Sequence, residues 1–329
     1  MKTIKFKWGK WLSILLIAGL ILSTGYQSFA SANDLKAYPA SGQMVDVGGH
    51  RLHIYCAGEG SPTVLMEAGM SGWSTDWILV QPEIAKKTRV CTYDRAGYGW
   101  SEEGPQPRDS RQVATELHTL LIEAGIDGEI ILVGHSLGGL FVQYYARTYS
   151  EQVAGIVLVD SVHPEQSSQM KEDVRKKYEG NLRALTLLTK IIAPTGLLRL
   201  ANQPETIIAG KLPFEYQSMV RALGFQSKAY RALDEEMASF EQSQIEVQNA
   251  EPLPKVPLVV ISSASLKNFP PGFSGDYMKS LWAELQADLT KSATMPHVIA
   301  EESGHYVHID QPELVIETIV EIVNTIRRK

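Results

Sequence analysis

One pentapeptide constrains this chain more than any other feature. Residues 134–138 read Gly-His-Ser-Leu-Gly, which matches the pattern G-x-S-x-G, and they directly follow the apolar run 129–133. A strand, a sharp turn and a helix in this order would expose Ser136 as a nucleophile. The turn requires small residues beside the serine, which the glycines supply. The N-terminus of the helix would then face whatever Ser136 attacks.

Short apolar runs and helical patterns alternate along most of the chain. Eight runs rich in Val, Ile and Leu indicate strands, at residues 43–47, 51–56, 63–67, 89–94, 129–133, 154–159, 257–262 and 296–300. Helical periodicity occupies residues 76–87, 111–124, 140–149, 277–289 and 312–327. Such runs are typical of a mainly parallel sheet buried on both faces, and Gly48-Gly49 predicts a hairpin with one antiparallel strand at that edge. We therefore predict an α/β sandwich of three layers.

The pattern changes between residues 163 and 254, where strand-like runs disappear. Amphipathic pieces replace them, broken by prolines and glycines, at residues 171–178, 182–192 and 228–248. We interpret this insertion after the sixth strand as a helical cap over the strand ends, between core segments 33–162 and 255–329. Its apolar part 182–200 resembles a membrane helix in length, but its charged residues and Pro194 favour a cap helix.

The first 32 residues have the pattern of an export signal. Four lysines precede the apolar stretch 11–22, and Ala30-Ser31-Ala32 supplies the small residues of a cleavage site. We predict a signal peptide over residues 1–32 and a secreted mature protein. The apolar stretch has only 12 residues, whereas a membrane span needs roughly 20. Counting residues 8–26 leaves a retained N-terminal membrane anchor as the alternative.

The charge balance limits the classes of partner that the protein can bind, and the cysteines bear on a disulfide. Removal of residues 1–32 takes away four lysines and no acid, which leaves 27 basic against 37 acidic residues. This balance, without a basic cluster, argues against a nucleic-acid partner, and a membrane is expected to be contacted only through an uncleaved signal segment. Cys56 and Cys91 both lie in strand-like runs. They permit a disulfide in an exported protein, or are simply two small buried residues.

Five ordered motifs resemble the α/β-hydrolase fold superfamily, in its capped, esterase-like and dehalogenase-like branch. They are Glu67-Ala68-Gly69-Met70, the stretch Tyr93 to Ser101, Val133 to Gly139, Val157-Leu158-Val159-Asp160 and Ser303-Gly304-His305-Tyr306. Together they run from about residue 43 to the C-terminus in the family's order. The resemblance implies an α/β-hydrolase fold with an eight-stranded, mostly parallel sheet and a helical cap after strand 6. It also implies a serine hydrolase.

The resemblance assigns a base to Ser136. A serine hydroxyl is a poor nucleophile at neutral pH and needs a neighbouring group to take its proton. His305 follows the last strand run in a Gly-His-Tyr loop and matches the family's catalytic histidine. The other histidines considered for this role are His135, His163 and His308.

The orienting acid departs from the usual family pattern. The common place for it follows the seventh strand, but residues 262–268 contain no carboxylate. A minority branch of the family places the acid at the end of the sixth strand, where Asp160 stands, and the order of serine, acid and histidine is kept. Asp276, beyond the loop 269–275, is the alternative.

Further features follow from the same resemblance. The oxyanion of a tetrahedral intermediate would be bound by the backbone N–H groups of Leu137 and Met70, with Ser71 as the competitor of Met70.

The family's strand order sets the second strand antiparallel to the fourth. Cys56 would then face Cys91 at a distance that a disulfide spans.

No cofactor and no metal are expected. The glycines of residues 94–99 lack G-x-G-x-x-G, and the pairs His50/His53 and His305/His308 lack the H-E-x-x-H pattern.

We expect a secreted serine hydrolase that cleaves a small to medium apolar carboxylic ester through an acyl-enzyme. The alternatives are the same triad applied to an amide, a lactone or a carbon–carbon bond, and a hydrolase-like ligand receptor. Aromatic and methionine side chains of the cap would line a substrate pocket or form plain core: Phe214, Tyr216, Met219, Phe225, Tyr230, Met237 and Phe240.

Overall fold

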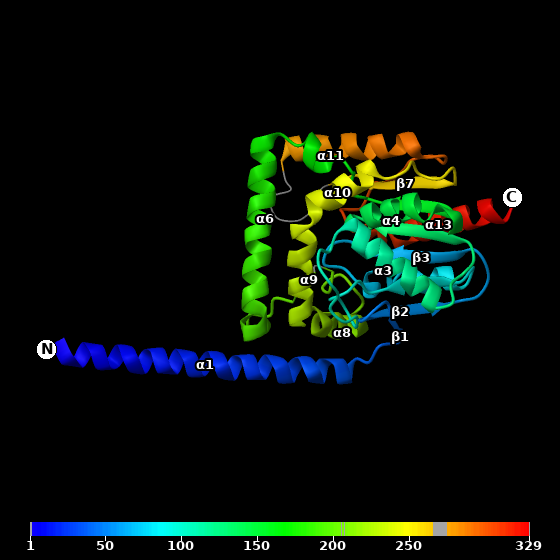
Figure 1. The fold of residues 1–329 in the computed structure, drawn as a ribbon. Coiled ribbons are helices and arrows are strands. Elements are labelled where there is room, and N and C mark those ends of the chain that lie inside the picture. Colours follow the sequence, from blue (N-terminus) through cyan, green and yellow to red (C-terminus); the bar gives the residue numbers. More distant parts are fainter. Residues whose placement is uncertain (1, 205, 207, 266–274, 329) are drawn as a thin grey trace.

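A computed structural model describes residues 2–204, 206, 208–265 and 275–328, with side chains from residue 9 onward (Figure 1). Its centre is one eight-stranded sheet in the order β1-β2-β4-β3-β5-β6-β7-β8. The strands are β1 Gln43–Asp46, β2 Arg51–Ala57, β3 Thr63–Glu67, β4 Val90–Tyr93, β5 Ile130–His135, β6 Val153–Val159, β7 Leu258–Ser263 and β8 Val298–Ala300. All eight predicted strands are therefore confirmed, with ends that shift by one or two residues.

The antiparallel edge is also confirmed. β1 and β2 pair antiparallel across Gly48 and Gly49, β2 pairs antiparallel with β4, and the pairs from β3 to β8 are parallel. Cys56 of β2 stands opposite Cys91 of β4, and a disulfide joins them. The bridge implied by the family resemblance is thus present, and it ties this edge of the sheet to its interior.

Successive residues of a strand point to opposite faces of the sheet, so both faces carry apolar side chains. A layer of helices covers each face. On one face, Leu65, Leu132 and Leu158 pack with α3 (Ser110–Glu123), α4 (Leu137–Thr148) and α11 (Asp276–Leu289). On the other face, Val64, Val133 and Val157 pack with α2 (Gln81–Ala85) and α13 (Pro312–Arg327). This is the predicted three-layer sandwich.

One predicted core helix was wrong in its extent. Residues 76–87 form a 3-10 turn, η1 (Ser74–Trp77), and then the short α2, rather than one helix. Pro82 stands at the start of α2. Proline has no N–H to donate to the carbonyl group four residues earlier, so Pro82 fits the first turn of α2 but not the interior of a longer helix that begins at residue 76.

The segment between β6 and β7 is helical, and we call residues 163–254 the helical segment. It contains α5 Gln166–Gln169, α6 Glu172–Ile192, η3 Ala193–Thr195, α7 Leu197–Leu200, α8 Phe214–Gly224, α9 Ser227–Ala238 and α10 Phe240–Asn249. The predicted pieces 171–178 and 182–192 are one helix, α6, which runs through Gly180. The predicted piece 228–248 is instead two helices separated at Ser239. The domain boundaries placed around this segment stay a prediction.

The N-terminal region forms one long helix, α1 (Lys2–Ala37), which projects past the body of the protein (Figure 1). Its part from Gly9 to Ala37 is long and apolar enough to cross a membrane. Residues 9–22 are exposed, whereas Gln27 is buried against the helical segment. The small-residue site at Ala30-Ser31-Ala32 lies inside this helix.

Candidate active site

Ser136 stands in the sharp turn between β5 and α4. Its backbone has φ +52° and ψ −121°, a left-handed conformation that non-glycine residues rarely adopt. A Cβ atom on Gly138 would lie 2.3 Å from the carbonyl oxygen of Ala68, so only glycine permits this close packing of α4 on the end of β3. Ser136 therefore occupies the strained, exposed turn that the G-x-S-x-G pattern predicts.

His305 lies in the loop between β8 and α12 (Val307–Asp310), and its ring meets Ser136. The Nε2 atom of His305 is 2.8 Å from Ser136 Oγ, and its Nδ1 atom is 2.7 Å from Asp160 Oδ2. The ring of His135 packs beside it with centroids 4.7 Å apart, and its Nε2 lies 2.9 Å from the His305 carbonyl oxygen. Three side chains predicted from distant parts of the sequence thus form one hydrogen-bonded chain.

Asp160 is the carboxylate that contacts His305. It follows β6 with φ +42° and is fully buried. Its Oδ1 accepts hydrogen bonds of 3.0 Å from the Ser263 backbone N–H and from Trp282 Nε1, while Ser263 Oγ donates to Oδ2 at 3.1 Å. We call Asp160, Ser263, Trp282 and His305 the Asp160 network. Asp276, the alternative acid, is the exposed first residue of α11, and the loop 266–274 before it lies outside the described residues.

Ser263 and Trp282 were not among the site residues expected from the sequence. Ser263 ends β7, which is the place where most of the family carries its acid, and the structure puts a hydroxyl and an N–H there that both bind Asp160. The absence of a carboxylate at this position was the available signal. Trp282 lies on the buried face of α11, and its indole N–H could not be distinguished by pattern from ordinary core.

The loop after β3 approaches Ser136 closely. A Cβ atom on Gly69 would lie 3.1 Å from Ser136 Cβ and 2.8 Å from His135 Nδ1. Met70 and Leu137 both line the cavity that contains Ser136 and His305, whereas Ser71 is absent from its described lining. Leu137 is the first residue of α4, so its backbone N–H has no acceptor inside the helix.

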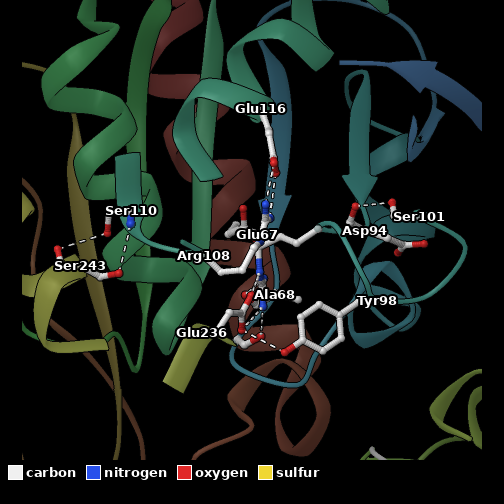
Figure 2. A network of polar contacts seen from close by, with 12 residues as sticks. Glu67, Ala68, Asp94, Tyr98, Ser101, Arg108, Ser110, Glu116, Glu236 and Ser243 are labelled. Atoms are coloured by element: carbon white, nitrogen blue, oxygen red, sulfur yellow. Dashed lines mark hydrogen bonds and ion pairs between the residues drawn. The ribbon is translucent and has the colours of Figure 1, made fainter. Parts of the chain in front are cut away.

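A second buried network lies directly beneath this loop. Nη1 and Nη2 of Arg95 donate hydrogen bonds to the carbonyl oxygens of Ala68 and Gly69 at 2.7 and 2.8 Å. The same guanidinium binds Glu67 Oε1 and Glu236 Oε1, both at 2.6 Å. Figure 2 shows Glu67, Ala68, Tyr98 and Glu236 gathered around this point. We call Glu67, Tyr93, Arg95, Tyr98 and Glu236 the Arg95 network, because Tyr93 and Tyr98 donate to its carboxylates.

The pKa values of Glu67 and Arg95 in the Arg95 network are both raised, but for different reasons. Burial raises the pKa of the Glu67 carboxyl, against the opposing effect of the Arg95 charge. The pKa of Arg95 stays well above its usual value because Glu236 and Glu67 stabilise its charge more than burial destabilises it. The network is therefore held by a cation that keeps its charge, with one carboxylate from β3 and one from α9.

The other histidines considered as bases are placed elsewhere. His308 is fully buried beneath His135, with ring centroids 4.5 Å apart, and burial lowers its pKa to about 3. Burial also lowers the pKa of His135 well below the ordinary value. His163 lies 3.3 Å from Asp288 and lines a different depression of the surface. Of these rings, only that of His305 is brought to Ser136 in the described residues.

The cavity over Ser136 is mostly apolar and measures about 450 Å³ including its mouth. Its lining is Met70, Ser136, Leu137, Val162, Gln166, Tyr178, Leu182, Met237, Phe240, Trp282 and His305. Of the seven helical-segment residues predicted as lining or core, Met237 and Phe240 line the cavity. Tyr230 is buried outside it, and Phe214 is almost fully exposed.

Of the histidine pairs considered for metal binding, His50 and His53 each contact a carboxylate, and His305 contacts Asp160. His50 Nε2 is 3.2 Å from Glu116, and His53 Nδ1 is 3.0 Å from Asp94. Within the part of the chain that the structure describes, no group of three or more potential ligands is arranged around a metal position.

Comparison with known proteins agrees with this architecture. The sequence model of the alpha/beta hydrolase fold matches residues 62–312. The uncharacterized protein YbdG of Bacillus subtilis (strain 168) is 24% identical over 246 residues, which cover 74% of this chain and 75% of that protein. A soluble epoxide hydrolase of Corynebacterium sp. (strain C12) is 30% identical over 116 residues, which span 35% of this chain and 40% of that enzyme.

Solved structures show the same fold at low identity. The epoxide hydrolase CorEH has a TM-score of 0.65 and 19% identity, with 86% of this chain and 98% of that one covered. A thermophilic esterase from Thermogutta terrifontis has a TM-score of 0.60 and 20% identity, with coverage of 86% and 98%. Because the family match extends over most of the chain, from β3 to α13, the protein belongs to the alpha/beta hydrolase family.

Proposed function

We propose that this protein is an extracytoplasmic serine hydrolase that cleaves carboxylic esters through an acyl-enzyme. One observation carries the proposal. Ser136 Oγ, the two ring nitrogens of His305 and Asp160 Oδ2 form a continuous chain with steps of 2.8 and 2.7 Å. This is the arrangement of nucleophile, base and orienting acid that acyl transfer requires.

The chemistry follows from that chain. Ser136 Oγ attacks the ester carbonyl carbon while His305 Nε2 takes its proton, and Asp160 holds Nδ1 and stabilises the imidazolium. When the tetrahedral intermediate collapses, His305 returns the proton to the departing alcohol and Ser136 remains acylated. Water then attacks the acyl group by the same steps, which releases the acid and restores the serine.

The oxyanion is assigned to the backbone N–H groups of Leu137 and Met70. The close approach of Gly69 to Ser136 and the free position of the Leu137 N–H at the start of α4 support this assignment. The side chains of both residues line the cavity. Loss of one such donor typically costs on the order of 100- to 1000-fold in rate.

The cavity favours an apolar acyl group. Leu182, Met237 and Phe240 supply its wall from the helical segment, which acts as the cap, and Val162 and Trp282 supply it from the core. The similar structures include an esterase and an epoxide hydrolase. Epoxide hydrolases of this fold need an aspartate as nucleophile, and position 136 is serine. The nucleophile therefore favours acyl transfer.

Export to the outer side of a membrane is supported by two features. Lys2, Lys5, Lys7 and Lys10 precede the apolar stretch of α1, a charge pattern that keeps the N-terminus in the cytoplasm and carries the rest of the chain across. The disulfide between Cys56 and Cys91 is of the kind that persists in an oxidising compartment. Both a cleaved signal and a retained anchor lead to this side.

The test uses the full chain and a fluorophosphonate probe, followed by chromogenic esters of graded chain length. We expect one equivalent of label on Ser136 and hydrolysis of apolar esters. Ser136→Ala should abolish both, whereas Ser71→Ala, in the neighbouring loop, should keep the labelling. An unlabelled wild-type protein would identify a binding module instead. Labelling with turnover confined to amides, lactones or carbon–carbon bonds would keep the triad and overturn the ester assignment.

A further inference from the structure

The second half of α6 has its polar side chains inside and its apolar side chains outside. Arg183, Thr186 and Lys190 all point inward, toward Asp234 of α9, whose side chain is 1% exposed. Thr186 Oγ1 donates to Oδ1 of Asp234 at 3.0 Å, and Lys190 Nζ lies 2.9 Å from Oδ2. The polar side chains of an isolated surface helix face water, so this half of α6 is reversed.

The outward side chains form an apolar stripe. We define it as Leu185, Leu187, Leu188 and Ile191 of α6 with Leu197 and Leu200 of α7, and all six are exposed. Ile191 and Leu200 are each 65% exposed. Outside α1 and this stripe, the large exposed apolar residues described lie singly on five different elements. A contiguous patch of this kind marks an interaction surface.

α1 docks against the end of the stripe through a polar face. Gln27 Nε2 donates to the Phe225 carbonyl oxygen at 2.7 Å, and Arg199 of α7 binds both Gln27 at 2.8 Å and Asp34 at 2.7 Å. Ser23 donates to the carbonyl oxygen of Thr195 in η3. Cleavage after Ala32 would remove the contacts of Ser23 and Gln27. These contacts exist in the protein only if α1 is retained.

The first half of α1 extends in the direction that the stripe faces. In Figure 1, α6 runs across the direction of α1 at the edge of the protein past which α1 projects, and α9 packs on the opposite side of α6. The exposed residues 9–22 are helical and would reach about 21 Å into the roughly 30 Å of a bilayer's hydrocarbon core. A bilayer crossed by this half of α1 would meet the outward face of α6.

We propose that α1 is a retained membrane anchor and that the apolar stripe rests in the outer surface of the bilayer that α1 crosses. Because the polarity of α6 is reversed and the stripe is continuous with α1, the partner of this surface is lipid. The stripe itself has no charged member, so its contact with the bilayer depends on buried apolar area and not on anionic lipid.

The position of α6 extends the proposal to the substrate class, and this part rests on the proposed function. Tyr178 and Leu182 on the inner side of α6 line the cavity over Ser136, while Leu187 and Ile191 lie on its opposite, exposed side. One helix thus separates the cavity from the bilayer surface. The substrate is an ester whose acyl chain is already partitioned into the membrane, such that it enters beside α6.

The docking is tested by depth measurement. A single cysteine replaces Leu188 or, as a matched control, Ile122 of α3, since both native side chains are 53% exposed and the native cysteines are paired. Each full-length variant is labelled with an environment-sensitive fluorophore and reconstituted into phosphatidylcholine vesicles that contain doxyl-labelled lipid. We expect strong quenching at position 188 and little at 122, unchanged in high salt. Equal quenching, or a label at 188 that is shielded only by a second copy of the chain, would overturn the docking. An intact mass that lacks residues 1–32 in the purified native protein would overturn the anchor.

The substrate class is tested by kinetics on the same vesicles. The double variant Leu188→Glu/Ile191→Glu should lose at least about tenfold in kcat/KM for a long-chain ester dissolved in the bilayer, while a short water-soluble ester is hydrolysed as before. Ile122→Glu should change neither. An equal loss on both esters, or no loss on either, would refute the membrane substrate. Fluorophosphonate labelling of Ser136 is read separately, so failure of the proposed function is distinguishable from failure of this inference.

Discussion

The carboxylate of Asp160 and the guanidinium of Arg95 are buried beside the same cavity, but their surroundings are built in different ways. Asp160 is held by neutral donors, Ser263 and Trp282, and every member of its network lies outside the helical segment. Arg95 is held by two carboxylates, and one of them, Glu236, comes from the helical segment. The first network contacts His305, and the second holds the loop of Met70.

The two kinds of surroundings suit two different tasks: positioning a carboxylate and holding a loop. A carboxylate that must accept a charged imidazolium beside it is held by dipoles, which position it without neutralising it. A loop that must present its backbone N–H groups is held by its carbonyl oxygens, and a guanidinium can bind two of them at once. Removal of one member should therefore affect chemistry in the first network and both folding and chemistry in the second.

The largest expected effect tests Ser136, the residue that contacts His305 of the Asp160 network. Ser136→Ala removes the only atom that would become acylated, so kcat for an apolar ester should fall by on the order of 10⁶-fold. The change also relieves no buried charge, so the thermal unfolding midpoint should stay near that of the wild type. Retained turnover would show that another residue is the nucleophile.

The next effect tests the acid itself. Asp160→Asn keeps the shape of the side chain but favours the wrong tautomer of His305, and kcat should fall by about 10⁴-fold. Asp276→Asn changes an exposed residue and should leave kcat unaltered. Steady-state kinetics on the same ester compares the two. The opposite ranking would transfer the role of acid to Asp276.

Arg95→Met breaks the second network. It leaves Glu67 and Glu236 buried without their partner, which should cost about 3–5 kcal/mol of the free energy of unfolding. It also frees the Ala68 and Gly69 carbonyl oxygens, so kcat of the folded fraction should fall as well. Denaturant unfolding and kcat are measured together at low temperature.

Arg108→Met is the matched control for this comparison. Arg108 is equally buried and binds Glu116 through two bonds of 2.6 and 2.8 Å, but it makes no described contact with the loop of Met70. Figure 2 shows Arg108 and Glu116 beside the Arg95 network. This variant should lose stability and keep its kcat. Equal losses of kcat in both variants would mean that Arg95 acts through stability alone.

The smallest expected effect is on the pH dependence of the free energy of unfolding, through the buried ring of His308. The pKa of His308 is about 3 in the folded protein, below its ordinary value of about 6.5 in an unfolded chain. The unfolded state therefore binds a proton first, and this contribution to stability is present above pH 6.5 and lost as the pH falls toward 3. At pH 4.5 the loss is about 3 kcal/mol.

His308→Phe keeps a ring against Trp77, from which His308 is 4.5 Å away, and removes the titration. Its free energy of unfolding should fall less than that of the wild type between pH 7 and pH 4.5. Parallel acid profiles for the two proteins would contradict a neutral buried His308. The contribution of His135, which has the same sign, remains in both.

Prediction from sequence succeeded where local pattern and physics coincide. The strands, the hairpin at Gly48-Gly49 and the turn at Ser136 each have a short-range signature. The family's order of motifs pointed to Asp160 and His305, which the structure brings together with Ser136, while their catalytic roles stay a prediction. The Arg95 network could not be predicted in this way. Glu236 lies 141 residues after Arg95 in an amphipathic helix, and nothing in its local sequence distinguishes it from a solvent-facing glutamate.

The direction in which α6 faces was equally inaccessible to sequence. The charged residues and Pro194 of the apolar part 182–200 predict a cap helix, but they do not tell which side of that helix faces inward. Only the placement of Asp234 shows that the polar side faces inward. Similarly, α1 carries the composition of an export signal, and its docked polar face is visible only in three dimensions.

The central claim is that Ser136 becomes covalently acylated with the help of His305. The most direct measurement mixes the full-length protein with a p-nitrophenyl ester, quenches the reaction within milliseconds with acid, and maps the acyl mass by peptide mass spectrometry. The claim predicts an adduct on the peptide that contains Ser136, formed with the burst of p-nitrophenol and absent from His305→Ala. Release of p-nitrophenol with no adduct on that peptide, or with the acyl group on another residue, would contradict it.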